Sequence, residues 1–171
     1  GREAAYPGFE KPSITGRADY FGIDGLRVGG GFYMGSTEYG KKGADTGADG
    51  SEVHIASVDF EYEIGALSLN GLLVAGHHDG NSALAATDFG GQYVTIGYEV
   101  WRDGEKAIIP FVRLSAYDTH EASASDSSEA EETTFGVHVP LSDQFVLKAD
   151  LIDETVADNQ TFSVGFGMMF Q

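Results

Sequence analysis

The chain has no cysteine, few basic residues and no long apolar run. The absence of cysteine excludes a disulfide framework, a thiolate metal site and a thiol nucleophile. The 10 lysines and arginines stand against 27 acidic residues, for a net charge of −17, which argues against a nucleic-acid partner because phosphate contacts need clustered cations. The most apolar stretch, 65–76, is interrupted by Ser68 and Asn70 and falls short of the ~18 residues that a membrane helix needs.

The chain is rich in apolar residues and in glycine. Of its 171 residues 42% are hydrophobic and 12% aromatic, enough for one domain, which we expect to span 1–171. Its 24 glycines are about twice the usual ~7%. The chain begins without Met or a signal peptide, and we expect it to be mature, processed or a portion of something longer.

Residues alternate with period two through most of the chain, which predicts β-strands. Each segment has about the length that a tilted strand needs to cross ~30 Å of hydrocarbon. The nine predicted strands are 13–21, 25–35, 53–64, 66–76, 90–102, 107–118, 132–140, 144–153 and 160–170.

Short and long connections alternate between these strands. Tight turns such as "FGIDG" and "EIGA" are followed by long polar segments such as "STEYGKKGADTGADGSE". This asymmetry is typical of outer-membrane barrels, which have short turns at one rim and long loops at the other. Aromatic residues that suit a membrane boundary fall near the short turns, namely Tyr20, Phe21, Tyr62, Trp101 and Phe170.

Within each predicted strand, alternate residues point to opposite faces, so the residues divide into two sets, or parities, which differ in chemistry. The apolar parity carries the residues predicted to face lipid: Phe32, Phe60, Tyr62, Ile96, Tyr98, Leu114, Leu147, Phe162, Phe166 and Phe170. The other parity collects the charges, and its predicted pore-lining residues are Arg17, Asp19, Arg27, Asp59, Glu61, Glu63, Glu99, Arg113, Lys148 and Asp150. Ten ionisable groups in a dry interior would each need a partner, so we expect this face to be wet.

The alternation therefore predicts an all-β, antiparallel, up-and-down transmembrane β-barrel with about nine strands in this chain. Residues 1–12 would form an outer loop or a partial N-terminal segment, and 13–170 the barrel strands. A soluble barrel with the bulky face inward is the alternative, but it does not explain loop asymmetry, strand length and the small inner residues together.

Four stretches carry a resemblance to a known family: "KPSITGRADYFGIDGLRVGGGFYMG", "GGQYVTIGYEVWRDGEKAIIPFVRLSAYDTH", "FVLKADLIDE" and "NQTFSVGFGMMF". They resemble the C-terminal half of Gram-negative outer-membrane porins of the phosphate-selective porin O and P type. Terminal Phe170 resembles the C-terminal insertion signal of such proteins, although Gln171 follows it. The family's phosphate specificity depends on a constriction rich in lysine and arginine, and no such cluster is present.

The strand count adds an expectation about the whole barrel. Single-chain bacterial barrels have an even number of strands, and nine is odd. We therefore expect this chain to be the C-terminal part of a larger barrel, of 16 to 18 strands in the family it resembles. The competing count is eight, with 13–21 or 132–140 not a full strand.

Candidate sites are few. Six acids against four bases on the wet face favour cations in a pore, whereas cross-strand ion pairs that stiffen the wall are the plainer explanation. The acidic connection with Asp118, Glu121, Asp126, Glu129, Glu131 and Glu132 is a candidate for Ca²⁺ or Mg²⁺, with a solvated loop as its alternative. The "DTGADG" stretch at 45–50 is better explained as a glycine turn than as a calcium loop. His77, His78 and Asp79 are better explained as residues at a strand end than as metal ligands. No catalytic motif is recognisable, and His138 is the only histidine inside a strand on the wet face.

The expected function is that of an outer-membrane porin, which passes small hydrophilic solutes or ions by passive diffusion with weak cation preference. The expected partners are outer-membrane lipid and lipopolysaccharide, with a homotrimer as an open option, no cofactor and no nucleic acid. A structural barrel without an open pore, such as a sheath or an adhesin, is the alternative.

Overall fold

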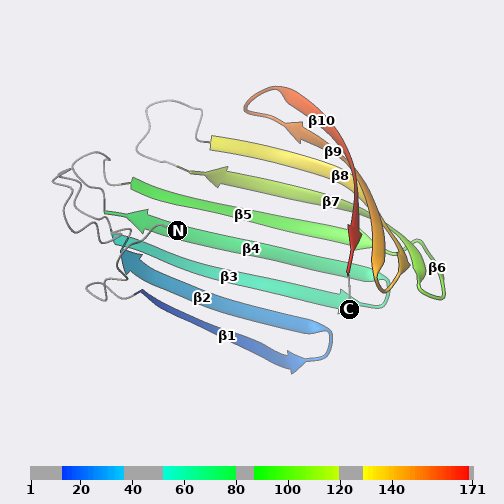
Figure 1. Cartoon of the computed structure of the whole chain (residues 1–171), viewed down its shortest axis with the longest axis horizontal. Coiled ribbons are helices and arrows are strands. Elements are labelled where there is room, and N and C mark those ends of the chain that lie inside the picture. The colour runs from blue at the N-terminus through cyan, green and yellow to red at the C-terminus, as the bar shows by residue number, and fades with distance from the viewer. Residues whose placement is uncertain (1–12, 37–51, 80–86, 120–128, 170–171) are drawn as a thin grey trace, which may run out of the picture.

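The computed structural model describes residues 13–36, 52–79, 87–119 and 129–169, and the regular structure in them is entirely β. No helix in these ranges is long and apolar enough to cross a membrane. Figure 1 shows the strands side by side in one sheet. They are β1 (Ile14–Ile23), β2 (Leu26–Ser36), β3 (Glu52–Ile64), β4 (Leu67–His78), β5 (Thr87–Tyr98), β6 (Trp101–Asp103), β7 (Lys106–Asp118), β8 (Glu129–Ser142), β9 (Phe145–Glu154) and β10 (Asn159–Met168).

The sheet is antiparallel and up-and-down. Its order is β1-β2-β3-β4-β5-β7-β8-β9-β10, with the short β6 paired to β7 alone. The sheet is open: β1 and β10 are its two edges, and each pairs with one neighbour among the described strands. The all-β antiparallel prediction is therefore confirmed, whereas closure into a barrel is not seen among the described strands.

Each of the nine predicted segments corresponds to a strand of this path, with one break. The segment 90–102 divides at Glu99 and Val100, which separate β5 from β6. The Glu99 N–H donates to the Ala66 carbonyl at 2.8 Å, and the Val100 N–H donates to the Ile108 carbonyl at 3.0 Å. The reason is that β4 begins only at Leu67, so the chain beyond Glu99 has β7 as its sole partner.

The connections alternate between short and long except between β9 and β10, which are joined by the short turn 155–158 at the end where the long connections lie. Tight turns at one end hold Gly25, Gly65 and Gly104 at positive φ, a conformation that glycine adopts without a steric cost. The connections that contain 37–51, 80–86 and 120–128 join strands at the other end. These ranges, residues 1–12, the 45–50 stretch and Phe170 lie outside the described residues.

Alternation along each strand and the pairing register divide the side chains between two faces. The apolar face carries Phe32, Phe60, Tyr62, Ile96, Tyr98, Leu114, Leu147, Phe162 and Phe166. The charged face carries Arg17, Asp19, Arg27, Asp59, Glu61, Glu63, Arg113, Lys148 and Asp150.

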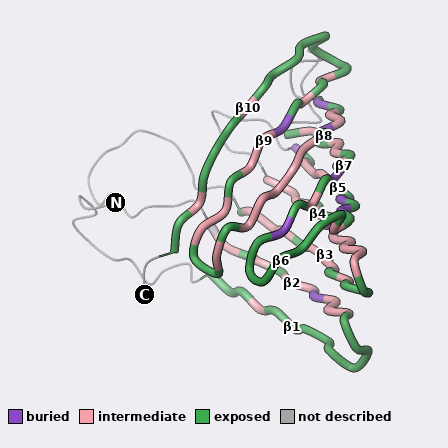
Figure 2. Tube along the Cα trace, turned by 90° about the vertical axis from the view of Figure 1, so that its right-hand side faces the viewer, coloured by how far each residue is buried: buried purple, intermediate pink, exposed green. Residues whose placement is uncertain are grey.

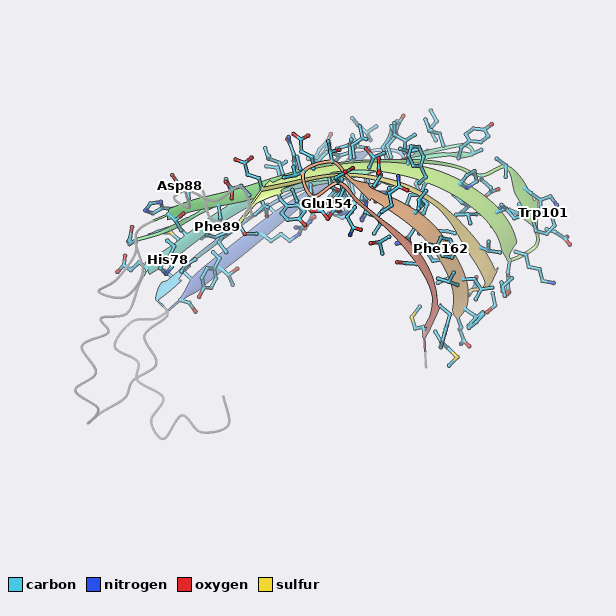
Figure 3. The ribbon with its side chains drawn as sticks, turned by 90° about the horizontal axis from the view of Figure 1, so that it is seen from above. His78, Asp88, Phe89, Trp101, Glu154 and Phe162 are labelled. Atoms are coloured by element: carbon cyan, nitrogen blue, oxygen red, sulfur yellow. The ribbon has the colours of Figure 1, made fainter. Side chains whose placement is uncertain are left out.

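The sheet is arched, and the charged face is on its inner side. In Figure 3, Asp88 of the apolar face projects from the outer side of the arch and His78 from the inner side. Side chains on the inner side of a curved sheet converge and cover one another. Accordingly Thr95, Phe111, Thr134 and Asp150 of the charged face are all buried.

The apolar face is left bare. Only Ala107, Phe111 and Ala130 are buried hydrophobic residues in the described chain, and Figure 2 shows buried positions as isolated points along the trace. Phe60 and Tyr62 are half-buried. The other described residues that were predicted to face lipid have exposed fractions from 39% at Leu147 to 71% at Phe166.

Aromatic side chains gather where the apolar face meets the short turns. Tyr20, Tyr62 and Tyr98 lie on this face close to the turns. Trp101 pairs with Ile108 on the same face and marks that end of the arch in Figure 3. Tyr20, Tyr62 and Trp101 therefore lie near the short turns as expected, with Tyr98 beside them, and their role at a membrane boundary stays a prediction.

The turn glycines allow a matched test of stability. A Cβ on Gly25 (φ 73°) would lie 2.1 Å from the Glu63 carbonyl oxygen, whereas a Cβ on Gly104 (φ 61°) would meet nothing within 4 Å. We expect Gly104→Ala to cost roughly 1–2 kcal/mol from the left-handed backbone alone. Gly25→Ala should lower the free energy of unfolding by clearly more, because the backbone at Glu63 must also move to make room for the Cβ. Urea unfolding of both variants checks this, and equal losses would contradict the described turn.

Candidate functional site

The charged face holds a network of ion pairs on β1, β2 and β3. We call Arg17, Asp19, Arg27, Asp59 and Glu61 the arginine–carboxylate network. Arg17 comes from β1, Arg27 from β2 and Asp59 from β3, so the network ties three strands together. Two guanidinium groups share three carboxylates.

The contacts within the network are short. Arg17 donates to Asp59 at 2.8 Å and to Asp19 at 2.6 Å. Arg27 donates to Asp59 at 2.6 Å, to Asp19 at 2.9 Å and to Glu61 at 2.9 Å. Arg27 therefore contacts all three carboxylates, and this geometry suits the fixed fork of donors on arginine.

A glycine makes the network possible. In the pairing register Gly29 lies between Asp19 on β1 and Asp59 on β3. A Cβ on Gly29 would stand 2.2 Å from Arg17 Nη2 and 2.6 Å from Asp19 Oδ1. The absent side chain leaves the space in which Arg17 crosses β2 to reach Asp59.

A second group of contacts lies on β5, β7 and β9. We call Tyr93, Phe111, Arg113 and Lys148 the basic–aromatic cluster. Arg113 donates to Thr95 Oγ1 at 2.8 Å, and its guanidinium stacks 4.6 Å from the centre of the Tyr93 ring. Lys148 Nζ lies 5.6 Å from the centre of the Phe111 ring. Cations over aromatic faces are stabilised by the ring quadrupole.

Lys148 also neutralises the most buried charge of this face. Its Nζ lies 3.0 Å from Asp150 Oδ2, and the Asp150 side chain is 7% exposed. The ring of His138 stacks on Phe111 with centroids 4.5 Å apart. A buried carboxylate needs such a partner because desolvation would otherwise destabilise its charged form.

Glu99 and Glu63 lie apart from both groups. Glu99 accepts hydrogen bonds from Arg102, including one from Nε at 2.8 Å. These hydrogen bonds hold the pKa of Glu99 below its ordinary value. Glu63 lies opposite Ser68 beside the β3–β4 turn, and its backbone N–H donates to the Gly25 carbonyl at 2.9 Å.

Of the ten residues predicted to line a pore, the structure brings five together in the arginine–carboxylate network and pairs Lys148 with Asp150. Sequence reasoning missed Arg102 and Tyr93. Arg102 follows Glu99 by three residues, and this short spacing was the one feature of the sequence that could have indicated their ion pair. Tyr93 meets Arg113 only through the β5–β7 register.

The acidic connection is only partly described. Asp118 ends β7, and Glu129, Glu131 and Glu132 belong to β8 rather than to a loop. Glu132 accepts a hydrogen bond from the Tyr117 hydroxyl at 3.2 Å. Glu121 and Asp126 lie outside the described residues. Binding of Ca²⁺ or Mg²⁺ at this end stays a prediction.

No family model, curated protein or solved structure matches the chain. Its function is therefore inferred from the two faces of the sheet and from the charges on the inner one.

The Glu99–Arg102 pair predicts a titration. Arg102→Gln removes the charged donor, so the pKa of Glu99 should rise toward its ordinary value. Carboxyl ¹³C shifts report this pKa, and Arg113→Gln is the control because Arg113 contacts Thr95 and Tyr93 instead. Because folding lowers the pKa of Glu99, the stability from the pair should be present above the unfolded-state pKa and fade as the pH falls through the folded-state pKa. An unchanged Glu99 titration in Arg102→Gln would contradict the pair.

Proposed function

We propose that this chain forms part of a transmembrane β-barrel porin of a bacterial outer membrane, which passes small hydrophilic solutes or ions by passive diffusion with weak cation preference. One observation carries the proposal. The outer side of the arch is apolar and bare, while the inner side holds ionised groups.

Lipid is the cover that best suits the apolar face. A single-layer sheet in water would leave residues such as Phe162, Val164 and Phe166 hydrated, with exposed fractions of 70% or more. Soluble domains avoid this by packing a second layer over the sheet. Hydrocarbon supplies the same cover without a second layer, and the rim of Tyr20, Tyr62, Tyr98 and Trp101 suits the boundary with the headgroups.

Closure into a barrel follows from the edges. Strands β1 and β10 each have an unpaired side in the described sheet, and unpaired backbone groups are not tolerated in hydrocarbon. We propose that further strands join these two edges and complete a barrel. The resemblance to porins of the phosphate-selective porin O and P type suggests 16 to 18 strands in all.

Water is the medium that best suits the charged face. Two charged groups of the arginine–carboxylate network are accessible, with Arg17 at 46% and Glu61 at 61% side-chain exposure, whereas Asp59 is 15% exposed and paired to both arginines. Six acids and four bases predicted to line the lumen leave it net negative, and charged walls of one sign favour counter-ions. We propose outer-membrane lipid and lipopolysaccharide as the surroundings and a homotrimer as the assembly to be tested.

Planar-bilayer recording of the full-length protein tests this function. We expect steady open-channel current and a reversal potential in a KCl gradient that indicates modest preference for K⁺. A barrel that is only a sheath or an adhesin would insert without a steady open current, and that result would overturn the porin proposal.

The charge balance predicts how selectivity shifts. Asp59→Asn and Glu61→Gln should move the reversal potential toward anions, whereas Arg27→Gln should move it further toward cations. Asp153→Asn, on the apolar face, is the matched control and should leave the reversal potential unchanged. Changes in reversal potential whose direction does not depend on the sign of the removed charge would contradict a lumen lined by these residues.

The two faces predict opposite tolerance to charge. Leu114 and Ser115 are neighbours on β7 that point to the apolar and the charged face. In lipid vesicles Leu114→Arg should lower the free energy of unfolding by ~2–4 kcal/mol. Ser115→Arg should cost little, because its guanidinium would stay in water opposite Glu132. Reversible urea unfolding measures both, and equal costs would argue against lipid on the apolar face.

A further inference from the structure

Two histidines and three carboxylates meet on the apolar face at the ends of β3, β4 and β5, away from the short turns. His54 on β3 is the register partner of His77 on β4, and His77 is the partner of Asp88 on β5. The Asp79 N–H donates to the Glu52 carbonyl at 3.0 Å, which continues the β3–β4 pairing by one step. Because alternate residues share a face, all five side chains lie on the same one.

The donor atoms are close enough for a shared ion. One ligand atom each of Glu52, His54 and Asp79 lies within 4.8 Å of the other two. His54 Nε2 stands 3.9 Å from Glu52 Oε2. Ligands at zinc bond lengths lie ~3.4 Å apart in a tetrahedron, so small rotations of these exposed side chains would complete the site.

We propose that Glu52, His54 and Asp79 bind one divalent transition-metal ion, with Zn²⁺ as the representative. Three protein ligands and an open fourth position for water form a familiar zinc arrangement. An imidazole nitrogen with two carboxylates also favours zinc over Ca²⁺ and Mg²⁺, which take oxygen ligands in larger number. The site differs from the acidic connection between β7 and β8 and does not depend on the porin proposal.

His77 is a positioning residue of this site. Its Nε2 lies 3.1 Å from Asp79 Oδ1, and its Nδ1 lies 2.5 Å from Asp88 Oδ1. The row Asp88–His77–Asp79 therefore fixes one oxygen of the Asp79 carboxylate and leaves the other to turn toward His54. Outer partners of this kind orient metal ligands and affect affinity.

Occupancy would join strand ends. Glu52 begins the described part of β3, and Asp79 follows the end of β4. An ion held between them would link the two strands at the point where their pairing stops. Side-chain exposure of 39% at His54 and 49% at Asp79 leaves the site open to an ion from solvent.

Competition with a chromogenic zinc chelator, on the full chain folded in detergent, tests the site. The wild type should bind one Zn²⁺ per chain saturably, and millimolar Mg²⁺ should not displace it. His54→Ala and the near-isosteric Asp79→Asn should each weaken binding at least ~10-fold. His77→Ala should weaken it in the same direction while leaving the stoichiometry at one.

His78→Ala is the matched control, because His78 is adjacent to His77 but points to the other face. It should bind Zn²⁺ like the wild type. The proposal is overturned if the wild type binds no Zn²⁺ saturably, if His54→Ala and Asp79→Asn bind normally, or if His78→Ala loses binding equally. Far-UV circular dichroism confirms folding of each variant, and Asp79→Asn keeps the test valid should His54→Ala misfold.

Discussion

The structure depends on one constraint: a single curved sheet has two faces and only one of them is compatible with water. Burial of apolar surface contributes about 25 cal/mol per Å², yet the described sheet buries only three hydrophobic residues. The favourable term that normally drives folding is thus missing until something apolar covers the outer side of the arch. Which medium covers that side decides the location and the function of the protein.

The inner face, in contrast, has to accommodate charged side chains. Long charged side chains converge there, so they need room and partners. Gly29 supplies room for Arg17, and Gly136 does the same under the Phe111 ring, where a Cβ would come within 2.4 Å of the ring. The high glycine content of the chain therefore serves packing on the concave side as well as turns.

Local periodicity was sufficient to predict most of the fold. Phe162, Val164 and Phe166 fall on one face because side chains alternate in any strand, and this needs no knowledge of neighbours. Pairing across strands is different. The contact between Arg17 and Asp59 depends on two registers and on a glycine in the strand between them. His54 and His77 are separated by a turn and nearly two strand lengths, so sequence position alone does not indicate that they lie side by side.

The break after β5 shows a related limit. Alternation runs smoothly through 90–102, but β4 provides no partner beyond Leu67, and Glu99 turns to Arg102 instead of to the other charges of the inner face. A pattern within one strand cannot indicate where its neighbour ends. Glu99 is therefore paired locally with Arg102 near the short turns, and its place in a lumen stays a prediction.

The distribution of charge on the inner face bears on what a lumen would admit. The arginine–carboxylate network on β1–β3 carries one more acid than base. The basic–aromatic cluster on β5, β7 and β9 holds Arg113 and Lys148, and Lys148 pairs with Asp150. Between them the middle of β4 and β5 presents uncharged residues such as Asn70 and Thr95. Glu132 on β8 and Glu154 on β9 are register partners on the same face, so the β7–β9 side is not net basic. In the proposed pore, both parts of the inner face would carry an acidic excess, and this excess would set the preference for cations.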